Sequence, residues 1–241
     1  IEWFENYNDL LSKVDAVSIA VPTKFHMEVS KNACLRSVNI LVEKPLAGTI
    51  DEAEKIIKMS KKAKVVLAVG HIERFNEAIK KAKFFLDSGS WGEIYSLSVR
   101  RLSPYPVRIS DVGVLFDLTI HDVDIVKYLV NSKVNEVFAV CQKFKNNGHE
   151  DYVNLSMSFD NNVMGLCETS WLNPVKTREI NISTQEVYAN INLLNQEITL
   201  NRSDGGSTKT VIETISLSPT EPLKSELLDF LQAISNKSKP L

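Results

Sequence analysis

The first 71 residues alternate between apolar runs of strand length and amphipathic stretches of helix length, which restricts the possible folds more than any other feature. The apolar runs cover residues 16–21, 39–42 and 65–69. A helix is expected over 51–62, with Thr49 as its N-cap. Strands that are joined through helical stretches pair in parallel, with right-handed crossovers. The pattern therefore predicts half of a doubly wound parallel sheet.

The later part of the chain has a different periodicity, in which apolar and polar residues alternate along short segments that are separated by turns. In 152–159 the apolar residues face one way and the polar residues the other. Such alternation predicts an antiparallel sheet covered on one face by helices, which we expect over 76–86 and 117–129. Further strands are expected over 163–171, 179–183, 187–193, 198–200 and 210–217.

These two patterns predict an α/β protein in which a partial doubly wound parallel sheet precedes an α+β domain. The second domain would hold a large, mostly antiparallel open sheet covered by helices on one face. A closing helix over 222–233 places four leucines on one side: Leu223, Leu227, Leu228 and Leu231. The bare face of the large sheet is a natural contact surface, so we expect a homodimer or homotetramer formed through it.

Composition excludes several classes of function. The 28 basic and 30 acidic residues give a net charge of −2, whereas a nucleic-acid-binding protein needs a basic face. No apolar run approaches the roughly 20 residues of a membrane helix, and nothing resembles a secretory signal. The three cysteines are far apart and form no C-x-x-C pair, which predicts a reducing, cytoplasmic location.

Polar clusters follow each of the three predicted parallel strands. They are Pro22-Thr23 with His26, then Glu43-Lys44-Pro45, then Gly70-His71 with Arg74. In a doubly wound sheet, ligands bind beyond the carboxyl ends of the strands. A lysine held there stabilises the negative charge that develops on a substrate oxygen. The alternative is that Lys44 simply extends from a strand end into water.

Asp117, His121 and Asp124 form a second candidate constellation. At about 100° per residue they lie within roughly 60° of one another on the expected helix. A histidine with a carboxylate one turn away is suited to general acid–base chemistry. A capping or surface Asp–His pair is an equally simple interpretation. We predict no metal site, because a second cluster of ligands is lacking.

Several cationic and aromatic side chains are candidates for binding a phosphate-bearing substrate. They are Arg74, Arg100, Arg101, Tyr105, Arg108, Lys176 and Arg178. Each of the charged residues, taken singly, is also explained as a solvated surface charge. Reasoning from the residues alone thus gives an α/β protein with a ligand-binding sheet edge and leaves the reaction open.

The order and spacing of these motifs resemble the Gfo/Idh/MocA family of NAD(P)-dependent oxidoreductases. The resemblance rests on A-V-P-T with His26, V-E-K-P at 42–45, G-H-I-E-R-F-N at 70–76, D-x-x-x-H-x-x-D at 117–124 and E-P-L-K at 221–224. The segments 70–76, 100–108 and 170–179 are most similar to the UDP-N-acetylglucosamine 3-dehydrogenase members. The resemblance implies hydride transfer between C3 of a UDP-N-acetylhexosamine and a nicotinamide cofactor, NAD or NADP with NAD favoured.

The resemblance also implies roles for individual residues. Lys44 would contact the nicotinamide ribose and the substrate, His121 would act as acid–base, and Asp117 would assist it. Pro22, Thr23, His26 and Glu43 would line the cofactor together with Lys44. Arg74, Tyr105, Lys176 and Arg178 would contact the nucleotide sugar.

The resemblance further implies the domain organisation. We expect an incomplete dinucleotide-binding (Rossmann-type) domain over 1–71, a substrate and dimerisation domain over 72–220, and a helix over 221–241 that packs back toward the first domain. The first strand and glycine-rich loop of the family are absent from this sequence. Two alternatives are a dehydrogenase of a free sugar or polyol, and a cofactor-free binding or assembly module if Ile1 is the true start.

Overall fold

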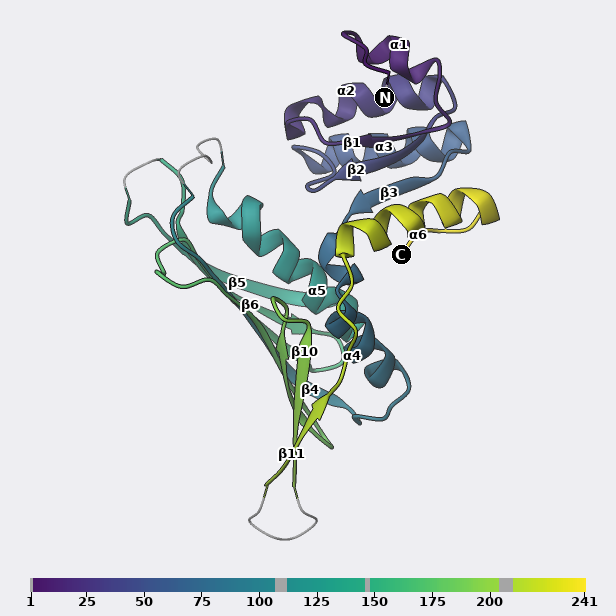
Figure 1. The fold of residues 1–241 in the computed structure, drawn as a ribbon. Helices are drawn as coiled ribbons and strands as arrows, with labels where there is room; N and C mark the ends of the chain where they lie inside the picture. Colours follow the sequence, from purple (N-terminus) through teal and green to yellow (C-terminus); the bar gives the residue numbers. More distant parts are fainter. Residues whose placement is uncertain (1, 107–111, 146–147, 204–209) are drawn as a thin grey trace. The chain divides into compact units, whose positions relative to one another are not determined.

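The computed structural model describes residues 2–106, 112–145, 148–203 and 210–241 (Figure 1). The chain forms two compact units. The first contains Ile1–Ile72 together with Leu223–Leu241, and the second contains Glu73–Pro222. Each unit has its own sheet and its own apolar core.

The first unit consists of α1 (Tyr7–Leu11), β1 (Ala16–Ile19), η1 (Thr23–Phe25), α2 (His26–Leu35), β2 (Asn39–Glu43), α3 (Ile50–Ala63), β3 (Leu67–Gly70) and α6 (Pro222–Asn236). Its three strands pair in parallel in the order β1-β2-β3. Ile40 and Val42 of β2 pack in a core cluster with Ile56 of α3. Leu41 instead packs with Phe230 of α6. Because alternate residues of a strand point to opposite faces, this sheet is covered on both sides.

Local capping signals define α3 as the sequence predicts. Thr49 is its N-cap, and the Thr49 side chain accepts a hydrogen bond of 3.2 Å from the backbone N–H of Glu52. At the other end, Lys64 adopts the left-handed conformation with φ of 56°, which terminates the helix. Short connections therefore join α3 to β2 before it and to β3 after it, as expected of a parallel βαβ arrangement.

The second unit begins with η2 (Ile72–Phe75), α4 (Glu77–Asp87), β4 (Ile94–Leu102), η3 (Leu115–Thr119) and α5 (Ile120–Val130). It continues with β5 (Val134–Gln142), β6 (Tyr152–Phe159), β7 (Met164–Ser170), β8 (Thr177–Thr184), β9 (Tyr188–Asn192), β10 (Glu197–Ser203) and β11 (Thr210–Ile215). The eight strands form one sheet in the order β11-β10-β9-β8-β4-β7-β6-β5. Within the described part of this sheet, β4 and β7 pair in parallel and the other neighbouring strands are antiparallel.

Helices α4 and α5 cover one face of the large sheet, as Figure 1 shows. The buried residues of β6, such as Leu155 and Met157, pack in one cluster with Ile125 and Val126 of α5. The opposite face carries exposed side chains, including Phe138 of β5. The predicted fold class is thus confirmed: a small parallel sheet, then a large and mostly antiparallel sheet covered by helices on one face.

Several local predictions need correction. Strands β4 and β5 were not expected from the sequence, although β4 is central in the large sheet. The helix expected over 117–129 begins as a π-helical turn, η3, so a regular 100° step does not apply across Asp117. The four leucines of the closing helix are exposed, and its buried residues are Glu226, Phe230 and Ala233.

Among the described helices, none is long and apolar enough to cross a membrane.

Candidate active site

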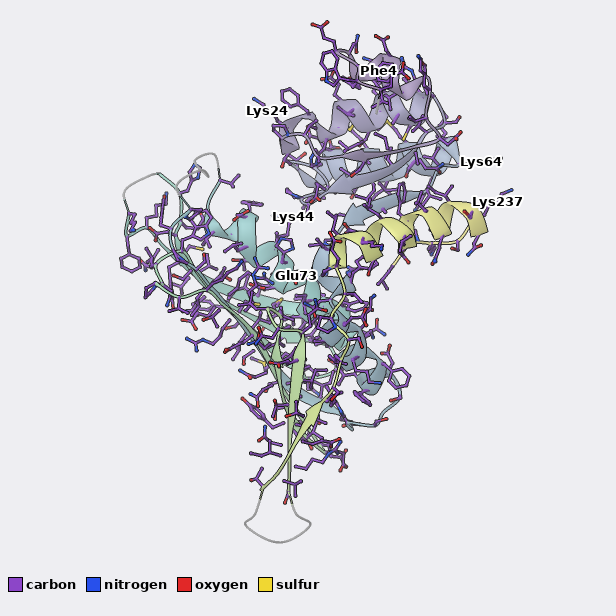
Figure 2. All side chains as sticks on the ribbon, viewed as in Figure 1. Phe4, Lys24, Lys44, Lys64, Glu73 and Lys237 are labelled. Carbon is purple, nitrogen blue, oxygen red and sulfur yellow. The ribbon has the colours of Figure 1, made fainter. Side chains whose placement is uncertain are left out.

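Lys44 lies directly after β2, at the carboxyl edge of the parallel sheet in the first unit (Figure 2). Its side chain is half-buried, and the peptide bond to Pro45 is cis. The predicted cofactor residues Pro22 and Thr23 lie after β1 at the same edge, where Pro22 is exposed and Thr23 begins η1. The strand-end polar residues of the sequence are therefore brought to one edge of the sheet, where ligands of parallel sheets bind.

His26 connects two of these strand-end loops. The ring is 1% exposed, and its two nitrogens each lie 2.9 Å from a backbone carbonyl oxygen, Nδ1 from that of Pro45 and Nε2 from that of Val21. Both polar atoms of the ring are thus engaged by the protein itself. We infer that His26 serves the proposed cofactor edge by fixing the backbone on either side of it.

Glu43 and Gly70 are register partners at the ends of β2 and β3. The Glu43 carboxylate accepts a hydrogen bond of 3.2 Å from the backbone N–H of Lys44. A Cβ atom at Gly70 would lie 3.0 Å from Oε2 of Glu43 and 3.2 Å from its Cα. Glycine at position 70 therefore leaves the room that the Glu43 side chain occupies.

Asp117 and His121 lie at the start of the helical segment in the second unit. Asp117 belongs to the π-helical turn η3, and His121 belongs to the first turn of α5; both side chains are half-buried. The carboxylate of Glu150 accepts the backbone N–H of Leu115 at 3.1 Å and occupies the space where a Cβ of Gly113 would lie. Glycine is therefore required at position 113, because any larger residue would displace the Glu150 carboxylate that holds the start of η3. Single π turns occur often at functional sites.

A buried network of charges lies beneath α5. The guanidinium of Arg101 donates to Asp122 at 2.6 Å and to Glu73 at 2.8 Å, and Thr169 donates to Asp122 at 3.2 Å. The same Glu73 carboxylate accepts a hydrogen bond of 3.3 Å from Arg178. Glu73, which Figure 2 labels, thereby joins two arginines from β4 and β8.

Arg178 belongs to this network through its hydrogen bond to Glu73. Its side chain is 30% exposed, and its pKa is lowered, first by burial and then by the charge of Arg101. The charges of Glu73, Asp122 and Asp117 act on it in the opposite direction. A partly buried guanidinium held in place next to a carboxylate is suited to binding a substrate anion.

The remaining predicted substrate residues have different surroundings. Arg74 donates two hydrogen bonds to Asp124, at 2.8 and 2.5 Å, and lies over the ring of Tyr128. Tyr105 packs edge-to-face against Trp171 with ring centroids 5.8 Å apart. Lys176 is exposed. Arg108 lies outside the described residues.

Sequence reasoning missed the parts of the site that depend on tertiary contacts. Arg101 is not a solvated or phosphate-facing charge, because it is 2% exposed and paired with two carboxylates. Glu73 and Asp122 lie within motifs that the sequence singled out, yet no local signal showed that both are buried. Their spacing of 21 to 28 residues from Arg101 gives no periodic pattern. Within the described residues, no group of three or more potential ligands could hold a metal ion.

Comparison with known proteins decides the family. A model described as "Oxidoreductase family, NAD-binding Rossmann fold" matches residues 1–71, and one described as "GFO/IDH/MocA C-terminal domain" matches residues 79–188. UDP-N-acetylglucosamine 3-dehydrogenase of Acidithiobacillus ferrooxidans is 30% identical over 236 residues, which covers 96% of this chain and 74% of the relative. The chain belongs to the Gfo/Idh/MocA family of oxidoreductases.

Other family members are similar over the same length. scyllo-Inositol 2-dehydrogenase (NAD+) of Bacillus subtilis is 28% identical over 254 aligned positions, covering 100% of this chain and 74% of the relative. A solved structure of the A. ferrooxidans UDP-N-acetylglucosamine 3-dehydrogenase matches with a TM-score of 0.89 and 30% identity, covering 99% of this chain and 76% of that chain. Membership of this family confirms the prediction that the chain is an oxidoreductase, and the cofactor of the family is NAD.

The strand-end residues of the first unit are chemically suited to hold part of such a cofactor. Val21 and Phe25 expose apolar side chains after β1, at 39% and 41%, and Lys44 supplies a cation after β2. Together they offer an apolar surface for a ring and a donor for a hydroxyl group. The sequence contains no G-x-G-x-x-G, so no residue of these 241 is assigned to the pyrophosphate through that motif.

Proposed function

We propose that the protein oxidises the C3 hydroxyl of a UDP-N-acetylhexosamine, with Lys44, Asp117 and His121 acting at the reacting carbon. The single observation that favours a nucleotide sugar is Arg178, a partly buried cation that Glu73 holds and whose charge interacts with that of Asp117. A diphosphate is recognised by a guanidinium fixed in this way. The 30% identity to a UDP-N-acetylglucosamine 3-dehydrogenase supports the same substrate class.

In the proposed mechanism, His121 accepts the proton of the C3 hydroxyl group. Lys44 donates a hydrogen bond to the same oxygen as negative charge develops on it. Asp117 orients the His121 ring and supports its charged form, which favours proton transfer. When bound, the nicotinamide ring supplies the acceptor for the hydride that leaves C3. Arg178, Lys176, Tyr105 and Arg74 are the proposed contacts for the nucleotide part of the substrate.

Competition by UDP tests the substrate class directly. We expect UDP alone to raise the melting temperature of the protein and to inhibit oxidation competitively against the sugar substrate, because Arg178 binds the diphosphate in both ligands. Uridine, which lacks the phosphates, is the matched control and should do neither. If UDP and uridine are equally without effect, the site does not recognise a nucleotide diphosphate.

A free sugar or polyol is the second candidate substrate. The similarity to inositol dehydrogenases, at 28% identity for the B. subtilis enzyme, favours it. Under this alternative UDP neither stabilises the protein nor competes, and myo-inositol or N-acetylglucosamine supports turnover without a nucleotide.

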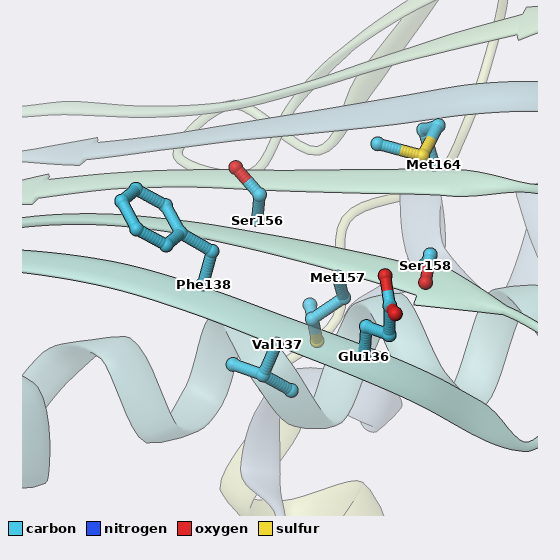
Figure 3. Close-up of a pocket in the computed structure, with 7 residues that line it drawn as sticks. All are labelled: Glu136, Val137, Phe138, Ser156, Met157, Ser158 and Met164. Carbon is cyan, nitrogen blue, oxygen red and sulfur yellow. The ribbon is translucent and has the colours of Figure 1, made fainter.

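We also propose that a second copy of the chain binds the open face of the large sheet. Register places Phe138, Ser156 and Leu166 in one row on that face, beside Met164, and the phenylalanine and the methionine are 70% and 45% exposed. Phe138, Ser156 and Met164 line a hollow of about 520 Å³ together with Glu136 and Ser158. Figure 3 shows how these side chains lie on the sheet. An apolar patch on an otherwise polar face favours a self-complementary contact.

A further inference from the structure

Tyr105 has a firm support at the edge of the large sheet where the parallel strands β4 and β7 end. Its ring packs edge-to-face against that of Trp171, with the centroids 5.8 Å apart, and Trp171 is 1% exposed. The segments that carry the two rings are bonded to each other, because Ser103 donates its backbone N–H to the carbonyl of Ser170 at 2.9 Å and accepts that of Asn173 at 3.2 Å. Contact with a buried indole therefore sets the orientation of the Tyr105 ring.

The ammonium group of Lys145 lies over this ring, with Nζ 4.9 Å from the ring centroid. The residue belongs to the connection between β5 and β6 and is exposed. Lys143 of the same connection differs, since its Nζ donates to the backbone carbonyl of Gly148 at 2.7 Å. The face of a tyrosine ring attracts a cation, and an ammonium group carries three N–H donors. Lys145 thus offers donors to a ligand from a defined place.

A buried carboxylate fixes the backbone of this lysine. Asp151 is 0% exposed, and its carboxylate accepts the backbone N–H of Lys145 at 2.7 Å and that of Phe144 at 3.1 Å. The backbone carbonyl of Asp151 accepts the N–H of Trp171 at 2.9 Å. One buried residue therefore anchors both the lysine and the indole on which Tyr105 packs. Because a buried carboxylate is costly unless it is hydrogen-bonded, the folded chain should keep these bonds.

The same connection adjoins the proposed reaction site. Glu150, which also lies between β5 and β6, accepts the backbone N–H of Leu115 at 3.1 Å, at the start of the η3 turn that contains Asp117. Tyr105 follows the end of β4 by three residues, and Arg178 is the second residue of β8, which pairs with that end of β4. Three residues of chain span at most about 10 Å, so the lysine over Tyr105 lies at the same sheet edge as Arg178.

We propose that Lys145 binds a phosphate group of the nucleotide sugar, as a second cation in addition to Arg178. This inference rests on the proposed function and adds a residue to the substrate contacts named there. A diphosphate carries more negative charge than one guanidinium neutralises, so a second cation at the same edge is complementary to it. The ammonium of lysine is a point charge without the fork of a guanidinium, so Lys145 should act through its charge.

Binding of UDP to single variants, measured by isothermal titration calorimetry, tests this assignment. We expect Lys145→Met to raise the Kd of UDP about five- to tenfold, because one charge-assisted contact to phosphate is lost. Lys145→Arg keeps the charge and should bind UDP within about twofold of wild type. Lys143→Met is the matched control, since it removes a cation that is bound to a carbonyl, and it should leave the Kd unchanged. Both lysines are exposed, so the melting temperature without ligand should stay the same in all three variants.

Kinetics separates the phosphates of the substrate from those of the cofactor. Lys145→Met should raise KM for the UDP-sugar about five- to tenfold and leave kcat and the KM for NAD within about twofold of wild type. The loss should shrink at about 0.5 M salt, because the charge of an exposed lysine is screened there. If the KM for NAD rises instead, Lys145 binds the cofactor and its assignment to the nucleotide sugar is wrong.

The remaining outcomes distinguish this inference from the proposed function. If wild type binds UDP and Lys145→Met binds it as tightly, or if Lys143→Met weakens binding as much, the role of Lys145 is overturned and the proposed substrate stands. If wild type binds neither UDP nor UDP-N-acetylglucosamine, the proposed function fails and the role of Lys145 fails with it.

Discussion

Nε of Arg101 lies 2.6 Å from Oδ1 of Asp122, and the two side chains are 2% and 0% exposed. The same guanidinium binds Glu73, which in turn binds Arg178. One buried cation thus connects the central strand β4 to the helix that carries His121 and to the arginine that is proposed to bind substrate. We expect these ion pairs to stabilise the second unit and to hold Arg178 and the helix of His121 in position.

Removal of this cation should be strongly destabilising. Arg101→Met leaves the Asp122 carboxylate buried with the hydroxyl of Thr169, and a stranded buried charge costs about 3–5 kcal/mol. The neighbouring Arg100 pairs with Glu168 at 2.7 Å where both side chains are more exposed, so Arg100→Met should cost less than about 1 kcal/mol. Urea unfolding of both variants measures the difference, and equal losses would contradict the buried network.

Arg178 should affect the binding of substrate more than that of cofactor. We expect Arg178→Gln to raise KM for a UDP-sugar by about 10- to 100-fold, the loss of one charge-assisted hydrogen bond to phosphate. KM for NAD should stay within about twofold. Lys127→Gln, at an exposed position of α5, is the control and should change neither constant. An equal rise in both KM values for Arg178→Gln would indicate general damage to the site rather than lost phosphate binding.

His121 should control the chemical step. Replacing it by asparagine removes the proton acceptor, so kcat should fall by at least about 100-fold while the melting temperature stays close to that of wild type. His149→Asn is a matched control, because that residue lies in a polar segment before β6 and has no proposed role. Steady-state rates at saturating substrate test this directly, and near-normal turnover of the His121 variant would remove it from the mechanism.

The open sheet face should set the oligomeric state. Phe138→Asp introduces a charge into the exposed row on β5, and we expect it to reduce the mass measured by light scattering toward that of one chain. Phe84 is also exposed, at 60%, but it belongs to α4, so Phe84→Asp should leave the mass unchanged. If both variants keep the wild-type mass, the interface lies elsewhere or the protein has none.

The sequence was sufficient for the fold class because periodicity reports directly on burial. Strand β6 has the predicted bounds, since Val153, Leu155, Met157 and Phe159 alternate with polar residues and face the helices. Strand β5 has no such alternation because all but its first residue are exposed at the sheet edge. Strand β4 was missed for another reason: its charged pair Arg100-Arg101 is typical of a surface segment, and only distant carboxylates allow Arg101 to be buried.

In the candidate site too, features that depend on distant contacts could not be predicted from the local sequence. Lys44, Asp117 and His121 could be proposed from the sequence because strand ends and helical spacing are local features. The burial of Glu226 could not be predicted, because the apolar periodicity of its helix indicates a buried face formed by the four leucines, which the structure exposes. Asp117 lies in a π-helical turn that no propensity scale predicts, so its angular relation to His121 was expected on the wrong helical geometry.

The most direct test of the proposed function compares substrates in a single assay that follows the absorbance of reduced nicotinamide. The account predicts that UDP-N-acetylglucosamine is oxidised with a kcat/KM at least about 100-fold higher than N-acetylglucosamine or myo-inositol, and that Lys44→Met and His121→Asn abolish this rate. Oxidation of a free sugar or polyol at an equal or higher kcat/KM would contradict the assignment to nucleotide sugars.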